Sequence, residues 1–136
     1  MLVELHVEDF DKARDFYTRL GFHVVWERHP ERFKGYLVMI SGANTLCFWG
    51  GNTDIYEQEY FSRFPSDTKK GYGVELVISV ENLDDIYREA QQFANIVEDM
   101  QLRPWGLRDF RIEDPFGFYL RFTTVHDIHN PKFAVK

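Results

Sequence analysis

Apolar side chains recur at helical spacing in two separate parts of the chain. The two sets are Phe10, Ala13, Phe16, Tyr17 and Leu20, and Leu83, Ile86, Tyr87, Ala90 and Phe93. This spacing is typical of an amphipathic helix that buries one side. Asp9 and Asn82 precede the sets, where a short polar side chain can cap a first turn, and Gly21 follows the first set. We therefore predict helices that begin near Asp9 and Asn82.

The two predicted helices belong to a repeat. Val-Glu-Asp-Phe-Asp at residues 7–11 aligns with Val-Glu-Asn-Leu-Asp at residues 80–84, and a strand-like run precedes each copy, over 2–7 and 73–80. Further strand-like runs follow the helices, over 22–28, 35–40, 45–49, 96–102, 107–112 and 118–123. Each half therefore predicts a β-α-β-β-β module, and the fold class is α+β.

The module boundaries predict a single domain over residues 1–136. Module one covers 1–50, a linker with a short helix near 55–64 covers 51–71, module two covers 72–124, and a polar tail covers 125–136. A module of about 50 residues buries little surface by itself, so the two modules must share a core or exchange with a partner chain. The Pro-broken tail is interpreted as a loosely held surface segment.

Composition excludes several classes of protein. The single cysteine, Cys47, allows neither an internal disulfide nor a multi-cysteine zinc site. The net charge of −6 without basic blocks argues against a nucleic-acid partner. No apolar run approaches the roughly 20 residues of a membrane span, and the first residues lack a signal-peptide pattern. We predict a cytoplasmic protein, in which the 17% aromatic content fills the core first and lines a pocket second.

Three motifs carry a resemblance to a known family. They are Val7-Glu8-Asp9 followed by Phe16-Tyr17-x-x-Leu20-Gly21-Phe22, the run over residues 80–87, and the run over residues 103–117 with Pro-Trp-Gly and Asp-Pro-Phe-Gly. Together they resemble the vicinal oxygen chelate superfamily, which includes glyoxalase I, extradiol dioxygenases, and fosfomycin- and bleomycin-resistance proteins. The third motif is most similar to the bleomycin-resistance branch. The resemblance implies two β-α-β-β-β modules in a curved mixed sheet, usually completed in a homodimer, whose concave face holds the ligand.

The metal-using members of this superfamily place one ligand in each of four strands. The resemblance maps these positions to Leu2, Cys47, Glu75 and Arg121. Leu2 cannot coordinate, and Arg121 adds a permanent positive charge where an anionic ligand is needed. His6 lies about 13 Å along the strand from Leu2 and cannot replace it. We therefore predict no metal and no other cofactor, and His126 and His129 are interpreted as surface residues of the tail.

The strand alternation predicts which side chains face the ligand. The predicted ligand-binding residues are Glu4, His6, Cys47, Trp49, Glu75, Trp105, Tyr119 and Arg121, where Trp105 comes from the resemblance. No catalytic residue is predicted, because no motif places a histidine to activate Cys47. Glu75 is expected within ion-pair or water-bridged distance of Arg121, either as a structural salt bridge or to orient a ligand. Loss of Arg121 would then leave the carboxylate unpaired.

The sequence therefore favours a metal-free small-molecule-binding protein of bleomycin-resistance type. Such a protein confers antibiotic resistance by sequestering an aromatic or cationic compound in a dimer cleft, and the acidic excess would steer a cation toward it. The alternative is a metal-dependent lyase, isomerase or dioxygenase of the glyoxalase superfamily. A third reading is an interaction module whose cleft serves only to close the dimer. The fold alone does not choose among these functions.

Overall fold

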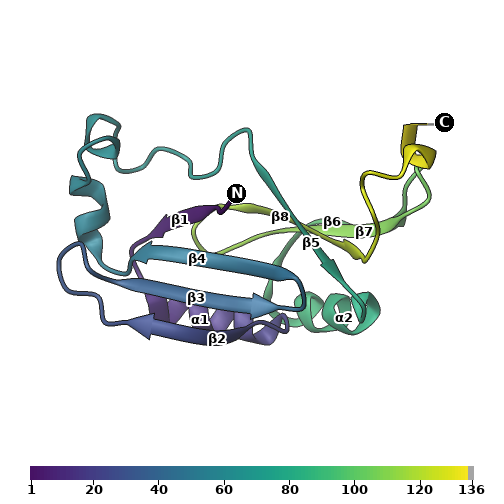
Figure 1. Cartoon of the computed structure of the whole chain (residues 1–136), viewed down its shortest axis with the longest axis horizontal. Coiled ribbons are helices and arrows are strands. Elements are labelled where there is room, and N and C mark those ends of the chain that lie inside the picture. The colour runs from purple at the N-terminus through teal and green to yellow at the C-terminus, as the bar shows by residue number, and fades with distance from the viewer. Residues whose placement is uncertain (135–136) are drawn as a thin grey trace. The chain divides into compact units, whose positions relative to one another are not determined.

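The computed structural model describes residues 1–134, which separate into one unit over Met1–Lys70 and a second unit from Gly71 onward. Both units contain the predicted β-α-β-β-β order (Figure 1). In the first unit the elements are β1 (Glu4–Val7), α1 (Phe10–Arg19), β2 (His23–Arg28), β3 (Tyr36–Ser41) and β4 (Asn44–Gly50). In the second they are β5 (Glu75–Val80), α2 (Leu83–Phe93), β6 (Asn95–Leu102), β7 (Arg108–Glu113) and β8 (Tyr119–Thr124).

Each unit forms its own four-stranded mixed sheet, and the two sheets have equivalent strand orders. The orders are β1-β4-β3-β2 and β5-β8-β7-β6, in which the first pair of each sheet is parallel and the others are antiparallel. Glu4 pairs with Cys47 in the first sheet, and Val77 pairs with Arg121 in the second. The predicted α+β fold class and the repeat are confirmed.

Helix α1 forms as its sequence predicts. The Asp9 side chain accepts a hydrogen bond from the backbone N–H of Lys12 at 3.1 Å, which satisfies one of the free donors of the first turn. Gly21 adopts φ +92° directly after the helix, a left-handed conformation that favours glycine. The apolar side of α1 is buried, and its Tyr17 ring contacts Phe48 of β4 at 5.4 Å. The helix therefore covers one face of its sheet.

Helix α2 begins where predicted, but its cap differs from the prediction. Asn82 occupies the N-cap position, yet its side chain makes no capping hydrogen bond. The first turn instead carries Asp84 and Asp85, whose negative charges favour the positive end of a helix. Leu83, Ile86 and Ala90 are buried, so the apolar spacing is confirmed even though the cap chemistry is not.

The segments outside the modules hold more structure than their composition indicates. The linker contains two short 3₁₀ helices, η1 (Thr53–Glu57) and η2 (Phe61–Arg63), in place of the one predicted helix near 55–64. The tail carries a third, η3 (Pro131–Ala134). Among residues 1–134, no helix combines the length and the apolar character that crossing a membrane requires.

Candidate functional site

A cluster of charged side chains links all four strands of the second sheet and the turn after β6. It comprises three arginines and three carboxylates, which are Arg103, Arg111, Arg121, Glu75, Glu98 and Asp109. Asp109 is buried, and the Arg111 side chain is only 11% exposed. Charges removed from water in this way need close partners of opposite sign.

Arg111 lies at the centre of this cluster. Its Nε donates to Glu75 Oε1 at 2.7 Å, and its Nη1 donates to Glu98 Oε2 at 2.7 Å and to Asp109 Oδ1 at 3.3 Å. Burial works against the charged guanidinium, but the hydrogen bonds to Glu75 and Glu98 outweigh it and raise the pKa of Arg111. The hydrogen bond from Arg111 in turn lowers the pKa of Glu98. Sequence reasoning missed Arg111 as a site residue.

Arg121 holds the predicted place beside Glu75. Its Nε lies 3.5 Å from Glu75 Oε1, so the predicted ion pair is confirmed. Glu75 is nevertheless bound more closely by Arg111, and Arg121 Nε is a buried donor without a hydrogen-bond partner among the described residues. The expectation that loss of Arg121 would leave Glu75 unpaired is therefore wrong, because Arg111 still holds the carboxylate.

A pocket of about 610 Å³ opens beside Arg121 in the second unit. Strands β5 and β8 contribute Val77, Ser79, Arg121 and Thr123 to its lining. Trp105 and Leu107 line it from the turn before β7, and His126, Ile128 and Phe133 line it from the tail. The structure thus brings the predicted residues Trp105 and Arg121 into one pocket.

The tail is the part of this lining that sequence reasoning missed. The Nδ1 atom of His126 is 2.8 Å from the carbonyl oxygen of Thr124, and the His126 ring contacts the Phe133 ring edge-on at 5.6 Å. Besides Val125 and Ala134, the described part of the tail carries two larger apolar side chains, Ile128 and Phe133, and both line the pocket. They were the available signal that the tail covers something apolar.

Tyr119 does not belong to the pocket lining. It lies at the start of β8, where its backbone pairs with Glu75 of β5 and Glu113 of β7. Burial raises the pKa of its phenol. Glu75 is likewise not a lining residue, and it lies 3.5 Å from the lining residue Arg121.

The remaining predicted residues gather on the open face of the first sheet. Strands β1 and β4 are adjacent, and their register pairs Glu4 with Cys47 and His6 with Trp49. The His6 ring lies 4.6 Å from the Trp49 ring and meets Phe61 edge-on at 5.0 Å. The structure therefore brings Glu4, His6, Cys47 and Trp49 together within the first unit.

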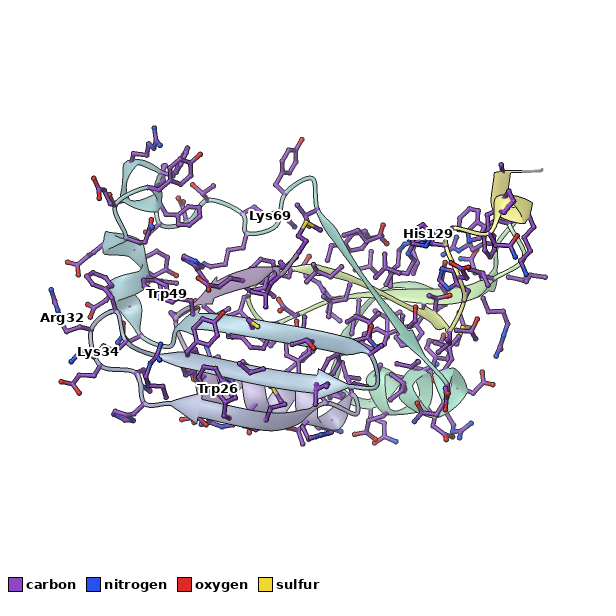
Figure 2. The ribbon with its side chains drawn as sticks, viewed as in Figure 1. Trp26, Arg32, Lys34, Trp49, Lys69 and His129 are labelled. Carbon is purple, nitrogen blue, oxygen red and sulfur yellow. The ribbon has the colours of Figure 1, made fainter. Side chains whose placement is uncertain are left out.

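Further aromatic rings extend this face. Phe33 stacks on Trp49 with ring centroids 5.8 Å apart, and Trp26 of β2 stacks on Tyr36 of β3 at 5.4 Å. Figure 2 shows Trp26 and Trp49 on the strands of the first sheet. We define the aromatic face as His6, Trp26, Phe33, Tyr36, Trp49 and Phe61. Sequence alternation alone identified only His6 and Trp49 as site residues, because the others depend on β2, β3 and the linker.

Glu4 is the carboxylate at this face. It accepts a hydrogen bond from the Tyr36 hydroxyl at 2.8 Å, and its other oxygen lies 3.3 Å from His6 Nε2. Burial is the largest cause that raises the pKa of Tyr36, followed by its hydrogen bonds with Glu4 and with the buried Cys47. Burial also lowers the pKa of His6, an effect that Glu4 partly offsets. The tyrosine and histidine rings are therefore uncharged at neutral pH.

We expect an NMR titration to place the pKa of His6 below its ordinary value of 6.5. The folded chain then binds this proton less tightly than the unfolded chain does. His6 consequently lowers stability as the pH falls from about 6.5 toward the folded pKa, and it costs nothing at higher pH. A Glu4→Gln variant removes the carboxylate that favours the imidazolium, so it should lower the pKa of His6 further. A higher pKa in that variant would contradict this account.

The chain belongs to the Glyoxalase/Bleomycin resistance protein/Dioxygenase superfamily, whose family model matches residues 2–122. The predicted resemblance is confirmed over nearly the whole chain. No curated protein matches the sequence.

Solved structures with the same fold include a bleomycin resistance determinant and a bleomycin-binding protein. The structure of TioX from Micromonospora sp. ML1 is 22% identical, with a TM-score of 0.65 over 91% of this chain and 96% of that one. A bleomycin resistance determinant encoded on the transposon Tn5 is 20% identical, with a TM-score of 0.65 over 93% and 98%. A bleomycin-binding protein complexed with bleomycin is 20% identical, with a TM-score of 0.61 over the same shares. At these identities the likeness establishes the fold.

The residues at the family's metal positions do not fit a metal ion. Leu2 is exposed and apolar, and Arg121 holds its positive charge beside Glu75. Across residues 1–134 there is no group of three or more His, Cys, Asp or Glu side chains arranged to hold a metal. Cys47 and Glu75 alone provide too few donors for a tight site.

We therefore predict that protein purified without chelators carries no stoichiometric zinc, nickel, manganese or iron. Elemental analysis by mass spectrometry measures this directly. Dialysis against EDTA should leave the melting temperature unchanged. Stoichiometric metal that disappears in a Glu75→Ala variant would contradict the prediction and favour a metal-dependent enzyme.

Proposed function

We propose that this chain is a metal-free small-molecule-binding protein of bleomycin-resistance type that sequesters an aromatic compound in the cytoplasm. The observation that carries the proposal is the pocket of the second unit. Its volume of about 610 Å³ lies within the range of small-molecule sites, roughly 300–1,000 Å³. Trp105, Leu107 and Phe133 give it apolar walls, and a few polar groups such as Arg121 can orient a ligand.

The aromatic face of the first unit supports the same proposal. Trp26 is 47% exposed and Phe33 is 42% exposed, although both side chains are large and apolar. Exposed aromatic groups of this kind mark surfaces that bind ligands or proteins. Flat rings offer stacking surfaces for a planar molecule, and this is the chemistry that a sequestering protein needs.

We also propose that the protein acts as a homodimer. Strand β2 lies at the edge of the first sheet, and its consecutive residues Val24, Val25 and Trp26 are exposed. An exposed apolar edge strand favours pairing with another chain. Sedimentation at micromolar concentration should give twice the chain mass of 16.2 kDa. A species of single-chain mass would contradict the dimer.

Calorimetric titration with 2-naphthamide, a neutral planar probe, tests the binding function. We expect saturable binding that EDTA leaves unchanged, with the probe recovered intact afterwards. Trp105→Ala should weaken binding about tenfold, because it removes an aromatic wall. The matched control is Tyr72→Ala, which removes an aromatic ring that is 87% exposed and outside the pocket lining.

Three outcomes would contradict the proposal. Conversion of the probe that depends on added metal would favour the enzyme alternative. A complete absence of binding by the native protein would favour an interaction module. Equal weakening by Trp105→Ala and Tyr72→Ala would place the binding outside the pocket.

A further inference from the structure

We infer that the pocket of the second unit binds its ligand through an anionic oxygen, so that its ligand class is a planar aromatic carboxylate rather than an aromatic cation. The inference rests on the proposed function, since it takes this pocket as the ligand site. It specifies the polar end of the ligand, which the aromatic walls leave undetermined.

The first observation is the unused hydrogen-bonding capacity of Arg121. This side chain lines the pocket and is 24% exposed. Its Nε is buried without a hydrogen-bond partner among the described residues. That atom faces Glu75 Oε1 at 3.5 Å, so a ligand oxygen would meet the exposed part of the side chain. A guanidinium offers its donors in a planar fork that matches a carboxylate, so two parallel hydrogen bonds can form.

The second observation is that Glu75 takes its hydrogen bond from Arg111 and not from Arg121. Its Oε1 accepts from Arg111 Nε at 2.7 Å, whereas Arg121 Nε remains 3.5 Å away. The other two carboxylates of the cluster accept from Arg103 and Arg111. The three carboxylates thus take their hydrogen bonds from Arg103 and Arg111. With Arg121 included, the cluster carries three positive and three negative charges, so it has no net negative charge to repel an anion.

The third observation concerns the rest of the pocket lining. Among the described residues that line it, none is an aspartate or a glutamate. A cationic ligand would therefore find Arg121 and no carboxylate, and a buried unpaired charge is costly. Thr123 Oγ1 already donates to the carbonyl oxygen of Arg108 at 2.8 Å. Arg121 is thus the group best suited to bind the polar end of a ligand.

This inference departs from the expectation based on net charge. The excess of acidic residues, which gives −6 over the chain, favours cations at long range. Binding at contact distance depends instead on the groups that line the pocket. Those groups carry a guanidinium and no carboxylate, so the local chemistry opposes the overall charge.

Calorimetric titrations of the full chain with three probes of similar size test the inference. The probes are 2-naphthoate, which is anionic, 2-naphthamide, which is neutral, and 2-naphthylmethylammonium, which is cationic. We expect the native protein to bind the naphthoate about tenfold more tightly than the amide, because the hydrogen bonds are charge-assisted. The ammonium probe should bind most weakly.

Two variants locate the preference. Arg121→Gln should bind naphthoate and amide equally, and Arg121→Lys should restore part of the difference because it keeps the charge. The matched control is Arg88→Gln on α2, whose guanidinium pairs with Asp85 outside the pocket; this variant should keep the full preference. Thermal unfolding of Arg121→Gln confirms that it folds, as expected while Arg111 still binds Glu75.

The outcomes separate the inference from the proposed function. Equal binding of naphthoate and amide by the native protein would overturn the anion preference and leave aromatic binding intact. Tightest binding of the ammonium probe would do the same. A preference that survives in Arg121→Gln would show that another group selects the anion. If the native protein binds none of the three probes, the proposed function fails and the inference fails with it.

Discussion

Replacing Arg111 with alanine should lower the free energy of unfolding by about 3 kcal/mol, because it removes the shared partner of three carboxylates. The variant loses the hydrogen bonds to Glu75, Glu98 and Asp109 together. Asp109 is 1% exposed, and its Oδ2 already has no partner among the described residues. Without Arg111, the buried Asp109 carboxylate loses one of its positively charged partners, and this loss should destabilise the fold. Urea denaturation measures the change in the free energy of unfolding.

Two arginines serve as controls for Arg111→Ala. Arg108→Ala, on the same strand, removes an exposed pair with Asp84, and such surface pairs contribute about 0–1 kcal/mol. Arg121→Ala should also have a small effect, because Glu75 keeps its hydrogen bond from Arg111. If Arg111→Ala were no more destabilising than Arg108→Ala, the charged cluster would not stabilise the second unit.

The sequence predicted the fold well because local patterns determine it. The apolar spacing over residues 10–20 and 83–93 gave both helices, and Asp9 behaves as the cap its residue type indicates. Asn82 shows the limit of such reasoning, since its side chain makes no capping hydrogen bond although α2 begins directly after it. Of the two 3₁₀ helices in the linker, η1 buries Ile55 and η2 buries no residue, so no apolar period marks them in the sequence.

The candidate site was predicted less completely, since several of its residues depend on pairing across strands. Arg111 lies opposite Arg121 in the β7–β8 hairpin. Counting back from the Asp-Pro-Phe-Gly turn at residues 114–117 gives this pairing, so the sequence held a signal for Arg111. His126 and Phe133 reach the pocket through the path of the tail, for which residue spacing gives no rule.

The same turn depends on one buried side chain, Asp114. Its Oδ1 accepts hydrogen bonds from the backbone N–H groups of Phe116 at 2.9 Å and of Phe118 at 2.8 Å. Asp114 is 5% exposed, so water cannot easily replace these bonds. Asp114→Ala should therefore lower the free energy of unfolding by about 2 kcal/mol, because it leaves two amide donors without an acceptor. Urea denaturation again provides the measurement.

Asp114→Asn is the matched variant, since it keeps an oxygen at the Oδ1 position and should lose less than about 1 kcal/mol. Asp127→Ala is an exposed control that removes a similar local acceptor, since Asp127 accepts a hydrogen bond from the His129 N–H at 3.0 Å. The Asp127 side chain is 72% exposed, so its loss should change the free energy of unfolding by less than about 0.5 kcal/mol. Because β8 begins directly after the turn and carries Arg121, Asp114→Ala should also weaken naphthoate binding. Equal stability of the alanine and asparagine variants would show that the acceptor at Oδ1 is not what holds the turn.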